Sequence, residues 1–271
     1  MVEVRVGVSG WRYPSWRGDF YPPGLLQRRE LEYVASRMNS AEINGSFYSL
    51  QRPSTYQRFV DDTPDDFLFA VKGGRFITHM RRLADVDTAL ANFLASGVLA
   101  LGTKLGPMLW QLPPSLEYDE RLVAGFLERL PRTTKQAAGL ARLHDDKVKP
   151  GRALVDAPVD LPIRHSMEVR HQSFCDEDAI GLLERYDVAL VVADSPGKWP
   201  YLERRTSDFM YARLHGHTEL YASGYSGSSL DAWAEKVRGW MGEGLDVFVY
   251  FDNDSRGRAP HDAVSLLRRL A

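Results

Sequence analysis

Three observations in the sequence predict an α/β fold of the (β/α)8 barrel type with parallel strands. Short apolar segments recur along the chain, and each ends abruptly in polar residues. Stretches of helical length separate most of these segments, an arrangement typical of a parallel sheet covered by helices. Eight such units in 271 residues match the size of one closed barrel. We therefore expect a single barrel domain over residues 1–271.

The first half of the chain supplies four predicted strands, and each ends in polar or turn-forming residues. Helices are expected where Leu, Val and Phe recur at helical spacing. The predicted strands are 4–8, 40–43, 67–71 and 107–110. The predicted helices are 25–38, 86–94 and 121–130, the last closed by Pro131.

The second half repeats the alternation of strand and helix. Its apolar segments are rich in Val, Phe and Tyr, which favours strands. The predicted strands are 165–169, 188–193, 209–212 and 247–251. The predicted helices are 179–186, 230–241 and 262–270.

Two connections depart from this regular pattern. Residues 194–207 are too few for a loop and a full helix, so the connection after the sixth strand is expected to be irregular. Residues 132–162 are many for a simple crossover and contain several Pro and Gly residues, which predicts an insertion on the barrel rim between strands four and five. An open doubly wound sheet is the alternative fold, but its Gly-rich first turn is missing at residues 9–13.

Composition and charge narrow the classes of function. Lys and Arg number 34 against 36 Asp and Glu, a balance that argues against a dedicated nucleic-acid-binding protein without excluding a local cationic pocket. Cys175 is the single cysteine, which rules out an internal disulfide and a thiolate zinc cluster. No secretory segment and no apolar run of about 20 residues is present, so we expect a cytoplasmic protein without a membrane partner. The oligomeric state stays open.

Seven short strings, taken together and in this order, resemble one protein family. They are 10–13 with Trp16 and 20–22, 42–48, 69–72 with 78–79, 105–107 with 111–114, 168–171, 211–216 and 250–254. The chain resembles the YecE-like proteins, catalogued as domain of unknown function 72, over essentially its whole length. The resemblance implies a TIM-type barrel and implies no activity. Ser46 stands where the family favours Thr, and Phe174 where it favours Trp.

Polar residues follow most of the predicted strands at their carboxyl ends. In a barrel these ends and the loops after them form the active-site face. Because alternate strand residues share a face, Glu168 and Arg170 point the same way, as do Arg213 and His215. The polar residues at these ends are Glu42, Asn44, Lys72, Gln111, Glu168, Arg170, His171, Asp194, Arg213, His215 and Asn253.

Four of these residues are candidates for proton transfer. Glu168 and Glu42 are carboxylates, and desolvation in a barrel mouth together with a neighbouring carboxylate would raise the pKa of one of them toward neutrality. His215 and His171 carry imidazoles, which titrate near neutral pH. The competing interpretation is that both acids are ion-pair partners of nearby cations and that both histidines are hydrogen-bonded to the rim.

Three cations are candidates for binding an anionic substrate. Arg170 and Arg213 present planar forks suited to carboxylate or phosphate, and Lys72 adds a mobile point charge. The alternative is an internal ion-pair network with Glu42, Glu168 and Asp194. The remaining candidate substrate contacts are Gln111, Asn44, Asn253, Asp194, His79, Tyr48 and Trp11.

Several residues admit two readings. Trp11 and Tyr48 belong to an aromatic-rich pair of loops that either stacks a ring of a ligand or forms a hydrophobic plug. Residues 252–254, Asp-Asn-Asp, lack the rest of a calcium loop and are interpreted as a turn.

The leading hypothesis is an enzyme, of lyase, isomerase or hydrolase type, that acts on a small phosphate- or carboxylate-bearing molecule without a redox cofactor. The first alternative is a metal-dependent phosphodiester hydrolase that holds a divalent ion at the acids and histidines. The competing cations and the lack of a compact ligand motif argue against a metal site, and no residue is predicted as a metal ligand. The second alternative is a non-catalytic barrel that binds a ligand or a partner protein.

Overall fold

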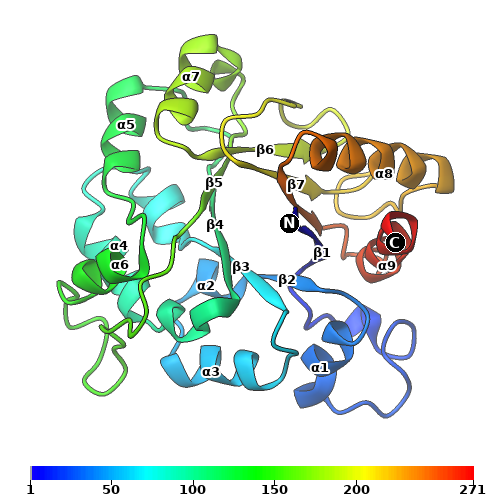
Figure 1. Cartoon of the computed structure of the whole chain (residues 1–271), viewed down its shortest axis with the longest axis horizontal. Coiled ribbons are helices and arrows are strands. Elements are labelled where there is room, and N and C mark those ends of the chain that lie inside the picture. Colours follow the sequence, from blue (N-terminus) through cyan, green and yellow to red (C-terminus); the bar gives the residue numbers. More distant parts are fainter. Residues whose placement is uncertain (1) are drawn as a thin grey trace.

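A computed structural model, which describes residues 2–271, shows a closed barrel of eight parallel strands. Each strand pairs with the next in chain order, and β8 pairs with β1 to close the barrel. Figure 1 shows the strands at the centre of the molecule with the helices outside them. The strands are β1 (Val4–Ser9), β2 (Ser40–Ile43), β3 (Leu68–Lys72), β4 (Leu105–Gln111), β5 (His165–Glu168), β6 (Ala189–Asp194), β7 (Phe209–Leu214) and β8 (Asp246–Phe251). The predicted fold class is confirmed.

The helices surround the barrel and agree with most of the predicted positions. The α-helices are α1 (Glu30–Ala35), α2 (Gly45–Tyr48), α3 (Pro53–Asp61), α4 (Asp87–Ala95), α5 (Glu120–Glu128), α6 (Thr134–Ala141), α7 (Glu177–Arg185), α8 (Gly227–Gly242) and α9 (Ala259–Leu270). Short helical turns are η1 (Pro14–Trp16), η2 (Gln27–Arg29), the π-helical η3 (Phe76–Met80), η4 (Val98–Lys104) and η5 (Gln172–Cys175).

The predicted helix 25–38 is shorter than expected. Gly24 has a positive φ of 81° and Leu26 is extended, so the chain is still turning where the helix was predicted to begin. Helix α1 then ends at Ala35, because the next residues lead directly into β2. Helix α3 was not predicted; it begins with Pro53, whose fixed φ suits a first helical position.

Alternating side chains divide the strands between two apolar layers. One set fills the barrel itself and includes Leu109, Val191, Phe209, Phe248 and Tyr250. The other set faces the helices and forms the larger core between sheet and helices. Because each strand continues this alternation to its carboxyl end, the inward positions there carry polar side chains into a shared space.

The two irregular connections lie where they were predicted. Between β6 and β7, residues 195–208 form turns and extended backbone without a helix. Between β4 and β5 the chain contains α5 and then the longer insertion, in which α6 buries Ala137 and Ala141. The insertion is therefore not a bare rim loop, because α6 packs against α4. Within residues 2–271, no helix combines the length and the apolar character needed to cross a bilayer.

Candidate functional site

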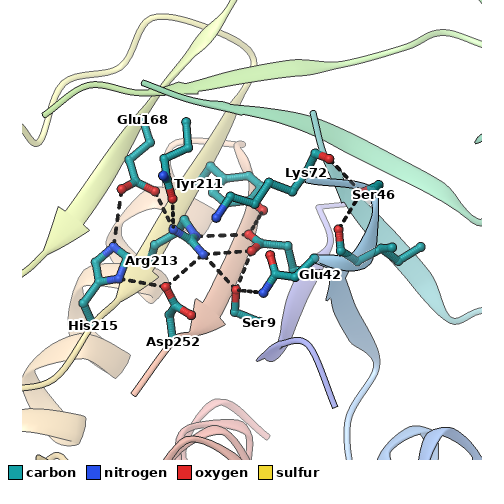
Figure 2. Close-up of polar contacts among 12 residues, drawn as sticks. Ser9, Glu42, Ser46, Lys72, Glu168, Tyr211, Arg213, His215 and Asp252 are labelled. Carbon is teal, nitrogen blue, oxygen red and sulfur yellow. Dashed lines mark hydrogen bonds and ion pairs between the residues drawn. The ribbon is translucent and has the colours of Figure 1, made fainter. Parts of the chain in front are cut away.

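A cluster of buried polar side chains lies at the carboxyl ends of the barrel strands. Glu42 is the third residue of β2, and Lys72 and Gln111 are the last residues of β3 and β4. Glu168 ends β5, and Arg213 lies one residue before the end of β7. Figure 2 shows that side chains from these separate strands point toward one another around Arg213. The structure thus brings these predicted residues into one place.

Arg213 is the centre of the cluster, and its side chain is fully buried. Its Nε and Nη2 donate to the two oxygens of Glu42, at 3.1 and 2.9 Å, and Nη1 donates to Glu168 at 2.6 Å. Nη2 also lies 2.8 Å from Ser9 Oγ and 3.0 Å from Asp252 Oδ2. Nη1 also lies 3.4 Å from Gln111 Oε1. An arginine has five N–H donors, and with these acceptors around all three nitrogens none is left free.

The expectation that Arg213 holds a substrate anion together with Arg170 is therefore corrected. A guanidinium whose donors already serve the protein's own carboxylates has none left for a ligand. Glu42 is occupied in the same way, because its oxygens also accept from Ser9 and Tyr211. Both residues fix the geometry of the cluster, as the ion-pair interpretation expected.

Glu168 also departs from its expected role. Burial by itself would raise the pKa of this carboxyl, but the charges of Arg170 and Arg213 hold it well below its usual range. Arg170 Nε donates to Glu168 Oε1 at 2.7 Å, while Arg213 serves the other oxygen. A carboxylate that stays ionised near neutral pH is a poor general acid or base, so the predicted rise in its pKa is wrong.

Arg170 differs from Arg213 because part of its guanidinium is free. Its Nη2 donates to Gln111 Oε1 at 2.9 Å, and its plane lies 3.6 Å from the ring centre of Trp199. Among residues 2–271, no acceptor is found for Nη1. Unlike Arg213, which is fully buried, Arg170 is partly exposed to solvent. Arg170 thus presents one open edge at the mouth of the barrel.

His215 forms a pair with an acid that the sequence analysis assigned to a turn. Its Nδ1 lies 3.0 Å from Asp252 Oδ2, and its Nε2 lies 3.6 Å from Glu168 Oε1. Nε2 is buried and has no hydrogen-bond partner within residues 2–271. Burial would raise the pKa of Asp252, but the Arg213 charge and the hydrogen bond with His215 hold it below its usual range. An ionised acid behind an imidazole is an arrangement that supports proton transfer.

Lys72 lies at the inward end of β3 and is 7% exposed. Its ammonium sits 4.4 Å from the ring centre of Phe47, which belongs to α2. No acceptor within hydrogen-bond distance and no acid within 4.0 Å is found for Nζ in the described chain. Burial, then the charge of Arg213, lower the pKa of Lys72 to about 8. Only glycine fits at the adjacent position 73, because a Cβ on Gly73 would lie 2.3 Å from the ring of Trp110.

Asn44 and His79 lie at the edge of the same site. Asn44 Nδ2 donates to Ser9 Oγ at 2.9 Å, and its buried Oδ1 has no partner among residues 2–271. His79 packs edge-on against Phe47. Burial, followed by the charges of Arg170 and Lys72, lower the pKa of His79 to about 4, so it is neutral at pH 7.

The structure places Trp11, Asp194 and Asn253 outside the cluster. Gly10 has a φ of 86° and turns the chain, so the Trp11 ring packs in the outer core, 5.0 Å from that of Phe59. Asp194 accepts from Tyr225 and Trp233 on the helix side of the sheet. Asn253 donates to Ser223 O and Asp262 Oδ2 and secures a loop. These three predicted substrate contacts are wrong in position.

Tyr48 and His171 lie on the surface near the site. Tyr48 is 71% exposed and contacts Phe47 edge-on. His171 caps η5: its Nδ1 accepts from the backbone N–H of Ser173 and shares a hydrogen bond with that residue's hydroxyl. Nothing in the structure joins either side chain to Arg213 or Glu168.

Strand alternation would have found the acid that was missed. In β8, Tyr250 fills the barrel and Phe251 faces the helices, so the next inward residue is Asp252 and not Asn253. In β6 the same rule makes Asp194 face outward, because Val191 points inward. Asp252 therefore takes the place that the sequence analysis gave to Asp194. Sequence position alone carried this signal, since the alternation is local.

Asp254 is a second acid whose surroundings were not foreseen. Burial and the neighbouring charge of Asp252 raise its pKa well above the usual value, and its Oδ1 is buried without a partner in residues 2–271. Two acids with pKa values shifted in opposite directions are typical of sites of proton transfer.

The arrangement of acids does not suit a metal ion. Among residues 2–271, no group of three or more His, Cys, Asp or Glu side chains is placed to hold one. Glu42, Glu168 and Asp252 each accept from Arg213, whose positive charge opposes a cation at the same oxygens. The metal-dependent alternative therefore gains no support from this geometry.

Comparisons with known proteins agree with the resemblance found in the sequence. Residues 5–271 match the model of a family described as protein of unknown function DUF72. The UPF0759 protein YunF of Bacillus subtilis is 24% identical over 296 residues, which cover 98% of this chain and 94% of that protein. The UPF0759 protein YecE of Escherichia coli is 29% identical over 129 residues, which cover 47% of this chain and 44% of that protein.

Solved structures show the same fold. A DUF72 family protein from Thermotoga maritima matches with a TM-score of 0.77 and 24% identity, covering 99% of both chains. Another from Enterococcus faecalis matches with a TM-score of 0.74 and 16% identity, covering 98% of this chain and 95% of that one. The family match spans nearly the whole chain, and the protein belongs to the DUF72 family.

Proposed function

We propose that this protein is an enzyme that acts on a small anionic molecule at the carboxyl mouth of the barrel by acid/base chemistry. The observation that carries the proposal is a set of buried or half-buried polar atoms at the mouth without partners in residues 2–271. They are His215 Nε2, Trp199 Nε1, Asn44 Oδ1, Arg170 Nη1 and Lys72 Nζ. Buried polar groups are normally hydrogen-bonded, so this group of free donors and acceptors supports ligand binding at the mouth.

The open edge of Arg170 is the binding group for the anion in this proposal. Its other N–H groups are fixed by Glu168 and Gln111, and Trp199 supports its plane. A guanidinium held in this way loses little rotamer entropy when it binds carboxylate or phosphate. Lys72 adds a positive charge from β3, which β4 separates from β5.

His215 is the group that moves a proton in this proposal. Asp252 holds Nδ1 at 3.0 Å, which leaves Nε2 to exchange a proton with the substrate. Once protonated, the imidazolium would lie between the carboxylates of Asp252 and Glu168, and both would stabilise its charge. Glu168 thus supports the proton transfer without carrying the proton itself.

The test compares two arginines that flank the two ends of β5. Arg170→Gln removes the open edge, whereas Arg164→Gln removes an arginine before the strand, where it pairs with Asp246 at 2.7 Å. Binding of phosphate, sulfate and small carboxylates is measured by calorimetry. We expect Arg170→Gln to weaken binding about tenfold or more, because the charge-assisted hydrogen bond from Nη1 is lost. Arg164→Gln should leave binding unchanged.

Two outcomes would contradict the proposal. Equal binding by wild type and Arg170→Gln would remove Arg170 from the site. For an anion that wild type converts, His215→Asn should retain binding and lose turnover about 100-fold or more. Tight binding with no turnover in wild type would favour the non-catalytic barrel instead.

A further inference from the structure

The structure contains two buried lysines whose surroundings differ completely. Lys104, at the end of η4, is 4% exposed, and its ammonium donates to Val60 O, Thr63 O and Thr63 Oγ1 at 2.7–3.2 Å. Lys72 is 7% exposed, and no acceptor in residues 2–271 is hydrogen-bonded to its Nζ. An ammonium on a largely buried side chain, without an acceptor from the protein, costs free energy. A fold that keeps one at the mouth of the barrel implies a use for the amine.

Charged groups from several strands face Lys72, and none of them forms an ion pair with it. Arg213 repels its charge, while Glu42, Asp252 and Glu168 attract it. These acids are already paired with arginines, and burial favours the neutral amine. His79, on the neighbouring η3, is itself neutral. The amine is therefore easily deprotonated, and a neutral amine is a nucleophile.

We propose that Lys72 is a covalent nucleophile that forms an iminium with the carbonyl carbon of a small oxo acid, whose anionic group Arg170 binds. This inference rests on the proposed function and names its substrate class. The inference assigns different tasks to the two cations that keep free donors: Arg170 holds the anion, and Lys72 reacts with the carbonyl group.

The step balances without an added oxidant or reductant. The lone pair of neutral Nζ attacks the carbonyl carbon, and the carbonyl π electrons move to oxygen. A proton passes from nitrogen to that oxygen to give a carbinolamine. The hydroxyl group then takes up one proton from solvent and leaves as water, and the nitrogen lone pair forms the C=N bond. The iminium carries the single positive charge that the ammonium of Lys72 had before.

The surroundings of Lys72 suit such a cation. The face of Phe47 stabilises a positive charge at Nζ, which lies 4.4 Å from the ring centre. Glu42, Glu168 and Asp252 balance the charges of Arg170 and Arg213 and leave one negative charge for the iminium. An iminium draws electrons from the adjacent carbon, and His215 Nε2 is free to exchange a proton with the substrate.

Reductive trapping tests the proposal directly. Wild-type protein is incubated with glyoxylate and sodium cyanoborohydride at pH 6.5–9.5, and modified lysines are identified by peptide mass spectrometry. We expect Lys72 to be modified at pH 7.5 about tenfold or more faster than exposed lysines such as Lys135, because more of its amine is neutral. Lys104 should stay unmodified, since its ammonium is fully hydrogen-bonded.

Further arms separate the two proposals. Glycolate, which has the anion but no carbonyl group, should slow trapping at Lys72, and Arg170→Gln should slow it as well. Lys72→Arg keeps the positive charge and should bind glycolate without forming any adduct at position 72.

If wild type binds glycolate through Arg170 but Lys72 reacts no faster than exposed lysines, the proposal of Lys72 as a nucleophile is overturned and the proposed function stands. If Arg170→Gln leaves glycolate binding unchanged while Lys72 is trapped rapidly, the amine is reactive but the oxo-acid assignment falls together with the proposed anion site.

Discussion

The cations buried in this barrel fall into two groups, and the difference between them separates stability from chemistry. Arg213 and Lys104 donate to acceptors on every side, from carboxylates in one case and from backbone and threonine oxygens in the other. Lys72 and Arg170 lie at the mouth and keep donors free. Burial separates the two groups only weakly, because the Arg170 side chain is 8% exposed, against 7% for Lys72 and 4% for Lys104. The number of N–H donors that have an acceptor separates them clearly.

The difference predicts opposite effects of substitution. Removing a cation whose donors are all hydrogen-bonded leaves buried acceptors or charges without a partner, which lowers the stability of the protein. Removing a cation that keeps free donors relieves a desolvated charge and weakens ligand binding or turnover.

The largest effect is expected at Arg213. Arg213→Met leaves Glu42, Glu168 and Asp252 crowded together without their shared partner. We expect the free energy of unfolding to fall by about 3–5 kcal/mol, measured by urea denaturation at pH 7. A loss comparable to that of an exposed arginine, such as Arg142→Met, would show that the cluster does not depend on Arg213.

A smaller loss is expected at Lys104. Lys104→Met leaves the carbonyl oxygens of Val60 and Thr63 buried without their donor. The free energy of unfolding should fall by about 2 kcal/mol in the same assay. Anion binding should be unaffected, because this lysine contacts α3 and the residues after it rather than the mouth. Loss of binding without loss of stability would reverse the assignment of the two lysines.

An effect of opposite sign is expected at Lys72. Its pKa of about 8 lies below the ordinary value, so between pH 8 and about 10.5 the unfolded chain binds more protons at this residue than the folded one. Lys72 therefore lowers stability below pH 8, and this penalty disappears as the pH rises toward 10.5. Lys72→Met should raise the free energy of unfolding at pH 7 by about 1–3 kcal/mol.

Urea denaturation across the alkaline range checks the sign of this effect. The stability advantage of Lys72→Met over wild type should shrink steadily between pH 8 and 10. A variant less stable than wild type at pH 7 would mean that Lys72 has a structural partner and belongs with Lys104.

Strand alternation explains both what was found in the sequence and what was missed. It placed Glu168 with Arg170, and Arg213 with His215, on inward faces, and the structure brings all four together. Applied to the sixth and eighth strands, the same rule selects Asp252 and rejects Asp194 and Asn253. The rule fails for Trp11, because the positive φ of Gly10 ends the extended backbone just before it. The rule holds only as far as the extended backbone continues.

The sequence by itself determined the closed parallel barrel, the irregular sixth connection and the insertion after the fourth strand, because these follow from local periodicity and segment length. Only the tertiary structure decided which cation meets which acid. Barrel closure sets residues far apart in the chain at hydrogen-bond distance, such as Glu42 and Arg213, and the stagger of the strands fixes their depth. Whether an N–H donor finds an acceptor depends on which side chains surround it in three dimensions, and no single segment of the chain contains that information.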